Sequence, residues 1–328
     1  MSISVAMCTY NGERHVREQL DSIAAQSRPP DELVICDDGS TDGTRVIVSN
    51  FGAAATFPVR VHVNEQNLGS TKNFERAIGL CTGEVIALSD QDDLWLPEKL
   101  AVLEAAFDRN PDVGLVFTDA EVVDENTCPT GRTLWETLQI PPADLESLRS
   151  RRTIDVLLQG STVTGATTAF RGRFKELVVP IPNDLPVTHD AWIAVLVGAA
   201  SEVLPLAQPL IRYRQHVDQQ IGPRPRVRIR SGRVRDALRR TSTDPHLLDV
   251  SVQVQQRLSE RGGAYNSDYA SSRLASRLTH MQTRVVLPEH ALPRLTRVAR
   301  ELFSGRYHAF SRGFLSAAKD LLHPPRPR

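Results

Sequence analysis

Short apolar runs alternate with segments of helical spacing over residues 2 to about 115. Apolar or alternating positions predict buried strands at residues 3–8, 33–36, 59–63, 85–88 and 113–117. Between two of them, apolar side chains recur at helical spacing at Val16, Leu20 and Ile23. Pro97 marks the start of a further helix. This order is typical of an α/β fold, in which helices cover a largely parallel sheet.

The rest of the chain is patterned less strongly. Residues 129–142 are rich in turn formers, and we expect a loop over the active face there. A strand at 165–170, a helix at 190–200 and a strand at 206–213 would complete one domain, residues 1–222. We expect residues 223–328 to form an Arg-rich linker and a helical C-terminal region.

Composition narrows the class of protein. The 328 residues are 41% hydrophobic, which allows an ordinary core and excludes a small disulfide scaffold. Lys and Arg total 39 and so do Asp and Glu, so net charge gives no reason to expect a nucleic-acid partner. The four cysteines form no C-x-x-C pair and are predicted to be core residues in a reducing compartment; they are Cys8, Cys36, Cys81 and Cys128.

Nothing in the pattern indicates secretion or membrane insertion. No basic segment with a cleavage site precedes the first predicted strand. The longest apolar runs, such as residues 191–200, fall far short of the roughly 20 residues that cross a bilayer. We therefore expect a cytoplasmic protein. Any membrane association would be peripheral, at the inner face of the plasma membrane.

Polar residues cluster directly after three of the predicted strands, at 8–12, 37–43 and 89–93. Open α/β sheets bind ligands at this edge. Asp90 and Asp92 offer hard oxygen ligands of the kind that Mg²⁺ or Mn²⁺ bound to a diphosphate requires. Taken alone, each acidic cluster fits a solvated turn or helix cap equally well. Their occurrence in order, at successive strand ends, favours a common site.

These motifs carry a family resemblance. Thr-Tyr-Asn-Gly-Glu at 9–13, Asp-Asp-Gly-Ser-Thr-Asp at 37–42, Asn-Leu-Gly at 67–69 and Asp-Gln-Asp-Asp-Leu-Trp at 90–95 resemble successive motifs of family 2 glycosyltransferases. The resemblance covers residues 2 to about 222 and implies a GT-A fold: a mixed, mostly parallel, Rossmann-like sheet flanked by helices, here with a C-terminal helical extension. The last motif is similar to that of the rhamnosyltransferase-like subgroup of bacterial surface-polysaccharide synthesis.

The resemblance implies roles for the matched residues. The nucleotide and donor would be held by Thr9, Tyr10, Asn11, Asp38, Gly69, Lys72, Asn73, Asp90 and Arg214. The metal ligands would be Asp92, Asp90 and His216. Asp190, in Thr-His-Asp-Ala-Trp, matches the position of the family's catalytic acidic residue before a helix and is the candidate base; it also fits a helix N-cap. The segment 213–216 resembles the family's Tyr-Arg-x-His, but Gln219 replaces the Asn that many members carry after it.

The implied reaction is inverting transfer of a sugar from a nucleotide-diphosphate donor, with Mg²⁺ or Mn²⁺ assisting departure of the diphosphate. The subgroup points to dTDP-rhamnose, with a UDP-sugar as the other donor considered, and to a glycan or lipid-linked acceptor. The alternatives are a non-catalytic nucleotide-sugar-binding protein and a sugar nucleotidyltransferase, which would need a Gly-rich loop after the first strand. A nicotinamide-dependent oxidoreductase is disfavoured because no G-x-G-x-x-G follows that strand.

Arginines gather after this region. Eight lie within residues 224–240, against Asp236 alone. They could hold anionic phospholipid or a lipid-diphosphate acceptor, or form a solvated linker. RNA binding is disfavoured because no aromatic residues are interleaved with them. Phe303, Tyr307, Phe310 and Phe314 recur at helical spacing, which favours packing over a membrane-facing surface.

Overall fold

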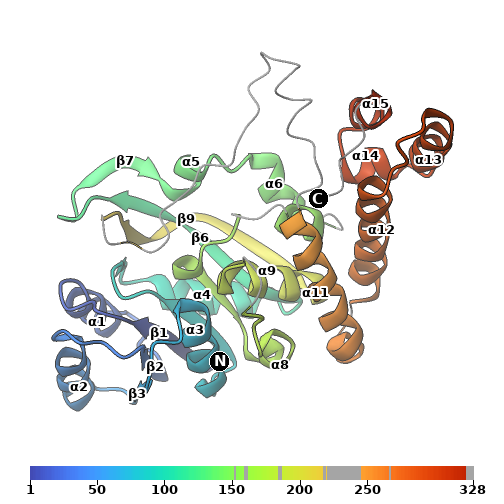
Figure 1. Cartoon of the computed structure of the whole chain (residues 1–328). Coiled ribbons are helices and arrows are strands. Elements are labelled where there is room, and N and C mark those ends of the chain that lie inside the picture. Colours follow the sequence, from blue (N-terminus) through green and yellow to red (C-terminus); the bar gives the residue numbers. More distant parts are fainter. Residues whose placement is uncertain are drawn as a thin grey trace. The chain divides into compact units, whose positions relative to one another are not determined.

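The computed structural model describes residues 1–150, 153–158, 162–183, 187–216, 219, 245–265 and 267–322. The chain divides into two compact units, Met1–Arg226 and Val227–Arg328, and each is described by itself (Figure 1). The Arg-rich segment 224–240 and the expected domain boundary at residues 222 and 223 lie outside the described residues.

One mixed sheet organises the first unit. Its described strands, in the order β3-β2-β1-β4-β8-β6-β9-β5 with β7 paired to β6, are β1 (Ile3–Thr9), β2 (Glu32–Asp37), β3 (Val59–Val63), β4 (Val85–Ser89), β5 (Leu94–Trp95), β6 (Val113–Val123), β7 (Pro129–Thr133), β8 (Thr168–Arg171) and β9 (Glu202–Arg214). The strands β1 to β4 pair in parallel, as the buried apolar runs predict. The long strands β6 and β9 also run in parallel, side by side (Figure 1).

The helices of the first unit pack against the sheet and against one another. They are α1 (Val16–Ala24), α2 (Thr44–Ala54), α3 (Ser70–Leu80), α4 (Lys99–Arg109), α5 (Leu134–Leu138), α6 (Pro142–Ser147), α7 (Thr153–Leu157), α8 (Lys175–Val178) and α9 (His189–Ala200). Helix α3 packs on β1 and β2, and α4 and α9 pack on β6. Helix α9 is apolar on most sides and almost wholly buried, as expected for a helix enclosed by other elements.

The strand register brings the polar clusters together. Thr9 at the end of β1 lies opposite Asp37 at the end of β2, and Ser89 at the end of β4 lies opposite Met7. The loops at 8–12, 37–43 and 89–93 therefore leave the sheet at one edge. This arrangement confirms the predicted α/β architecture and the common position of the three clusters.

Two local expectations are wrong. Residues 129–142 are not a loop, because β7 pairs antiparallel with the extended β6 and a capping box of Thr133 and Glu136 starts α5. Strand β8 begins only at Thr168, after the 3₁₀ turn η1 (Gly165–Thr167). Cysteines 8, 36 and 81 are buried as expected, whereas Cys128 is exposed.

The second unit is helical where it is described. It contains α11 (Pro245–Arg261), α12 (Asp268–Val285), α13 (Ala291–Phe303), α14 (Arg306–Phe310) and α15 (Phe314–Leu322), with a 3₁₀ turn η3 (Gly262–Ala264) after α11. Its buried cluster is formed by Leu287, Val298, Tyr307 and Ala317. Within the described residues, no helix is both long and apolar enough to cross a bilayer.

The aromatic series 303–314 does not share one packed face. Gly305 has a φ of 77°, which ends α13 and redirects the chain into α14. Tyr307 is consequently buried, whereas Phe303 is 90% exposed and Phe314 is 68% exposed. The packing interpretation is right for Tyr307 and wrong for Phe303 and Phe314, because the helical spacing spans three helices.

Candidate functional site

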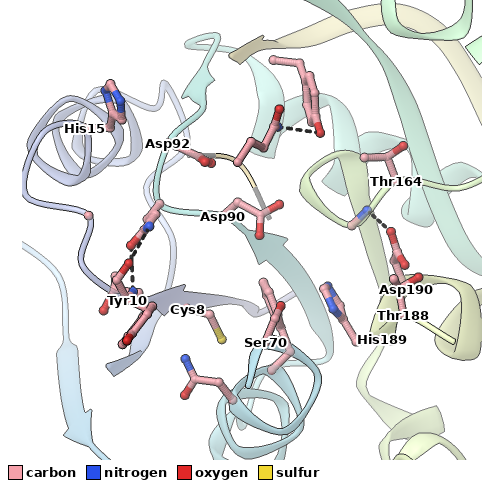
Figure 2. A pocket seen from close by; sticks show the side chains of 18 of the residues that line it. Cys8, Tyr10, His15, Ser70, Asp90, Asp92, Thr164, Thr188, His189 and Asp190 are labelled. Atoms are coloured by element: carbon pink, nitrogen blue, oxygen red, sulfur yellow. Dashed lines mark hydrogen bonds between the residues drawn. The ribbon is translucent and has the colours of Figure 1, made fainter. Parts of the chain in front are cut away.

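A pocket of about 640 Å³ opens at the edge where the polar loops leave the sheet (Figure 2). It is lined by side chains from all three loops, from the start of α9 and from the end of β9. The predicted site residues among them are Thr9, Tyr10, Asn11, Asp38, Asn73, Asp90, Asp92, Asp190 and His216. The structure thus brings together residues that are up to about two hundred positions apart in the chain.

Hydrogen bonds join the first two loops to each other and brace the second one internally. The Thr9 hydroxyl donates to Asp37 Oδ2 at 2.9 Å, and the Ser40 hydroxyl and amide donate to the same carboxylate at 2.5 and 2.9 Å. Asn11, whose φ is 45°, receives the Thr41 amide on its side-chain oxygen at 2.8 Å. These contacts hold the pocket wall in a fixed shape without any ligand.

Asp38 and Asn73 form a second buried clamp. The Asp38 carboxylate accepts the amides of Leu68 and Gly69 at 2.8 and 2.9 Å and the side chain of Asn64 at 2.7 Å. The Asn73 amide donates to the Cys36 carbonyl at 2.8 Å, while its oxygen accepts from Asn64 at 2.9 Å. Both residues line the pocket; Asp38 fixes the turn that precedes α3, and Asn73 ties α3 to the end of β2.

Carboxylates crowd the third loop. Asp90 is half-buried near Asp92 and Asp190, and loss of solvation, followed by the repulsion of these two, raises the pKa of Asp90 to about 8. Burial and the same kind of repulsion raise the pKa of Asp93 well above its usual range, and its Oδ2 has no hydrogen-bond partner. Lys99 supplies a buried countercharge behind them, with its pKa lowered to about 7 by burial.

Asp92 lies beside a histidine. Its Oδ2 is 2.9 Å from His216 Nε2, and the His216 ring centroid is 5.0 Å from that of His15. Within the described part of the chain, no set of three His, Cys, Asp or Glu side chains is arranged to hold a metal ion. The donor set nevertheless suits a hard divalent cation. Carboxylate and imidazole ligands are present, and the neighbouring carboxylates have too few positively charged groups around them to offset their charge.

Asp190 faces the same pocket from α9. Its Oδ2 accepts the Gly165 amide at 2.9 Å and its Oδ1 accepts the Ala191 amide at 2.7 Å (Figure 2). The position before the helix is taken by Thr188, so Asp190 lies in the first turn rather than at the N-cap itself. Two backbone amides fix the direction of its carboxylate and leave each oxygen a further lone pair.

Three of the expected donor residues are not among those that line the pocket. Lys72 Nζ donates to Glu75 and to the Ile181 carbonyl, both at 2.7 Å. Arg214 is 3% exposed, and its guanidinium donates to Glu18 and to the carbonyls of Asp92 and Glu125. Gly69 contributes its amide to Asp38. In this structure Gly69 and Arg214 bind residues of the polar loops, Lys72 binds Glu75 and Ile181, and none of the three lines the cavity.

Several pocket residues had escaped the sequence reasoning. His189 is 8% exposed, stacks on Phe74 with centroids 3.9 Å apart, and its buried Nε2 has no hydrogen-bond partner. Gln91 binds the backbone of Tyr10 through both ends of its amide, at 2.8 and 3.0 Å. His189 could have been found from its place beside Asp190, whereas no local signal marks Lys99 as buried.

Comparison with known proteins places this geometry in a family. The family model described as glycosyl transferase family 2 matches residues 4–179. The chain is 29% identical to an uncharacterized glycosyltransferase of Nostoc sp. over 221 residues, 66% of this chain and 65% of that protein. It is 28% identical over 216 residues to an uncharacterized protein of Mycobacterium tuberculosis, 65% of this chain and 59% of that one.

Two further similarities concern better described proteins. An Escherichia coli UDP-Glc:alpha-D-GlcNAc-diphosphoundecaprenol beta-1,3-glucosyltransferase is 27% identical over 125 residues, 38% of this chain and 48% of its own. The crystal structure of Staphylococcus aureus TarS residues 1–349 with UDP-GlcNAc superposes with a TM-score of 0.60 at 19% identity, covering 98% of this chain and 88% of that one. The matched regions thus span 59% to 65% of the first curated relatives. The chain belongs to glycosyl transferase family 2 and has the GT-A fold.

Proposed function

We propose that this protein transfers a sugar from a nucleotide-diphosphate donor to a hydroxyl group of an acceptor. One observation carries the proposal: Asp90 and Asp92 from the loop after β4 and Asp190 from α9 line one pocket of about 640 Å³. A donor diphosphate and a reacting hydroxyl both fit the chemistry of that arrangement. We further propose that residues 1–222 form the catalytic domain.

The donor nucleotide belongs on the side of the first two loops. Thr9, Tyr10, Asn11, Asp38 and Asn73 line the pocket there, and their backbone is held by the contacts between β1, β2 and α3. Tyr10 is 38% exposed, so its ring is available to a base, while Asp38 lines the pocket and keeps one lone pair on Oδ2 for a ribose hydroxyl. This side of the pocket is preformed, which lowers the entropic cost of binding.

The acidic loop fits a divalent cation. Asp92 would hold Mg²⁺ or Mn²⁺, with Asp90 and His216 as the further protein ligands and diphosphate oxygens completing the set, as is common for Mg²⁺. When bound, such a cation offsets the charge that develops on a departing diphosphate. Asp90, Asp92 and His216 all line the pocket, where they would hold such an ion.

Asp190 is the proposed base. Its carboxylate is aimed by the Gly165 and Ala191 amides and retains lone pairs that can accept the proton of an acceptor hydroxyl. Attack from the side opposite the diphosphate would invert the anomeric centre, as the family resemblance implies. The acceptor oxygen forms the new glycosidic bond, the bond to the diphosphate breaks, and the proton remains on Asp190.

The identities of donor and acceptor rest on relatives. The Asp-Gln-Asp-Asp-Leu-Trp motif supports a rhamnosyltransferase-like specificity and dTDP-rhamnose, whereas the Escherichia coli glucosyltransferase supports a UDP-sugar. That relative's name also includes a diphosphoundecaprenol-linked acceptor, which supports a glycan or lipid-linked acceptor here. Such an acceptor would place the enzyme at the inner face of the plasma membrane.

A thermal-shift panel tests the donor site. Nucleotide diphosphates and their sugars are added with and without Mn²⁺ to the wild type, to Asp92→Ala and to Asp108→Ala, an exposed aspartate of α4. A ligand of the native state raises the melting temperature by mass action. We expect one nucleotide to give a Mn²⁺-dependent rise that is kept in Asp108→Ala and lost in Asp92→Ala.

Turnover separates the alternative functions. Release of nucleoside diphosphate with a sugar acceptor supports transfer, and binding without any turnover would indicate a nucleotide-sugar-binding protein. Consumption of a nucleoside triphosphate and a sugar phosphate would indicate a nucleotidyltransferase. If no nucleotide shifts the melting temperature of the wild type, the donor-site assignment is wrong.

A further inference from the structure

Helix α13 exposes an apolar row in the second unit. Leu292 is 79% exposed, Leu295 is 51% exposed and Phe303 is 90% exposed. Leu295 lies three positions after Leu292 and Phe303 lies eleven positions after it, a spacing that places the three side chains along one side of a helix. The opposite side of α13 is anchored in the core of the unit by Val298, which is 2% exposed. Exposure of three large side chains in one row is unusual for a solvated helix.

Helix α15 adds to this apolar surface. It packs against α13 and exposes Phe314 at 68%, Leu315 at 66% and Leu322 at 71%. Together the two helices leave six large apolar side chains in water within 31 residues of chain. Burying each such side chain in an apolar phase is worth about 1.5–3 kcal/mol, so some partner of matching chemistry is expected to cover them.

The charge around the row indicates which partner. Residues 286–322 contain six Lys and Arg, among them two exposed arginines of α13. At 3.6 residues per turn, Arg300 borders the apolar row, whereas Arg297 lies further round the helix. Of the three acidic residues in this segment, Glu301 and Asp320 are buried and paired with arginines, which leaves Glu289 as the exposed one. The outer surface of this helix pair is therefore apolar and cationic at once.

We propose that the α13 face, defined as Leu292, Leu295, Phe303 and Arg300, docks the protein on an anionic lipid surface, with Arg297 as a further cation on the exposed part of the helix. A helix with Leu and Phe on one side and Arg at the border lies in the plane of a membrane interface, with its apolar row among the acyl chains. The arginines bind the anionic headgroups, whose attraction falls off within a Debye length. A second copy of the chain suits this face less well, because a two-fold contact brings the same arginines together.

This inference concerns the second unit and does not depend on the donor-site assignment in the first. The expected attachment is peripheral, through side chains that are exposed in the fold. Substitutions there should leave the fold intact, since exposed positions away from networks usually change stability little.

Vesicle sedimentation of the full chain tests the proposal. The vesicles are phosphatidylcholine alone or phosphatidylcholine containing phosphatidylglycerol. We expect the wild type to bind the anionic vesicles and to be released by salt. Leu295→Ser combined with Phe303→Ser should weaken binding about 100-fold, because two side chains of the row are lost. Arg297→Gln combined with Arg300→Gln should weaken binding to anionic vesicles about 30-fold.

Matched controls come from exposed positions of the first unit. Val46→Ser in α2, where Val46 is 64% exposed, controls for removal of an apolar side chain. Arg17→Gln combined with Arg109→Gln controls for the loss of two positive charges. Both controls should bind anionic vesicles as the wild type does, and all variants should keep the nucleotide-induced thermal shift of the wild type.

Three results overturn the proposal. The first is a wild type that binds neither kind of vesicle. The second is binding that the two α13 variants retain in full, which would assign the contact to another part of the chain. The third is a wild type that forms a dimer in solution and that Leu295→Ser with Phe303→Ser converts to a monomer, which would make the face an interface between copies of the chain.

Discussion

Buried acids occur in both units of the protein, in opposite electrostatic settings. In the first unit, Asp93 is buried and Asp90 is half-buried beside it, and loss of solvation with the repulsion of neighbouring carboxylates raises the pKa of Asp90 to about 8. In the second unit, Asp320 receives two hydrogen bonds from Arg284, at 2.6 and 3.1 Å, and a third from Tyr307 at 2.7 Å. A cluster left short of positive charge is suited to a ligand, whereas a completed one serves the fold.

The buried histidines repeat the contrast. His280 in α12 meets Glu301 with Nδ1 at 3.0 Å and Ser311 with Nε2 at 2.9 Å. His189 in α9 stacks on Phe74 and leaves its Nε2 without a partner. An unpaired buried polar group costs about 1–3 kcal/mol, a cost that His189 carries beside the pocket and that the two partners of His280 remove.

Removing a carboxyl group from the pocket should cost activity and not stability. Asp90→Asn removes a carboxyl group that can give up its proton and bind a metal ion, so we expect turnover to fall about 1000-fold through loss of a metal ligand. The melting temperature should stay the same or rise, because the folded protein no longer has to hold a carboxyl group whose pKa is raised to about 8. Turnover and thermal unfolding of the same preparation measure both effects. Turnover within about tenfold of the wild type would contradict the proposed role of Asp90.

Breaking the buried ion pair of Arg284 and Asp320 in the second unit should cost stability and not activity. Arg284→Met leaves the Asp320 carboxylate, which is 2% exposed, without its main countercharge. We expect the free energy of unfolding of this unit to fall by about 3 kcal/mol. Amide hydrogen exchange in α12 and α15 should speed up correspondingly, with the nucleotide-induced thermal shift unchanged.

The exposed pair of Arg17 and Asp21 provides the control. These side chains are 63% and 53% exposed, and Arg17→Met should cost less than about 1 kcal/mol. Equal exchange rates in Arg284→Met and Arg17→Met would show that burial does not distinguish the two pairs.

The pH dependence of stability should also separate the units. The folded-state pKa of Asp90, about 8, lies above its unfolded value, so the native state binds more protons and stability falls as pH rises from about 4 to 8. Burial raises the pKa of Glu301, but hydrogen bonds from Arg306 and His280 outweigh it and lower that pKa overall. The stability that Glu301 contributes is therefore lost only as pH falls below its unfolded value.

Thermal unfolding between pH 5 and pH 8 checks this difference. The melting temperature of the wild type should decline by a few degrees over this range, and Asp90→Asn should decline less, because asparagine does not titrate. A parallel decline in the wild type and in Asp90→Asn would assign the effect to another group.

Much of the first unit follows from apolar periodicity, and the exceptions have physical causes. Strands β1 to β4 are predictable because each contains its own apolar or alternating run, at 3–8, 33–36, 59–63 and 85–88. Strand β7 was missed because its residues are polar and mostly exposed, so no apolar alternation marks it. Pairing with β6, a contact beyond its own sequence, creates the strand.

The site shows the same limit. Asp90, Asp92 and Asp190 are recognisable because their types and order match a family motif. Lys99 is not, since a lysine in an amphipathic helix normally faces water. It is buried here because its Nζ donates to the Ala166 carbonyl at 2.8 Å and lies 3.7 Å from the centroid of the Trp95 ring. Those partners lie on remote or irregular segments that local patterns do not connect.

The smallest effect is expected from substitution of His189, which tests whether the unpaired Nε2 of this residue binds a ligand. Burial lowers the pKa of His189 against a smaller opposing effect of Asp190, so its ring is neutral at pH 7 and can donate or accept one hydrogen bond at Nε2. His189→Leu removes that atom, and we expect kcat/KM to fall about tenfold, the worth of one hydrogen bond to a bound ligand. His189→Gln places an amide group near the same position and should restore part of the loss, whereas a merely structural ring would give equal kcat/KM in the two variants. The melting temperature should not fall in His189→Leu as it should in a matching His280→Leu, because both nitrogens of His280 have partners and the Nε2 of His189 has none.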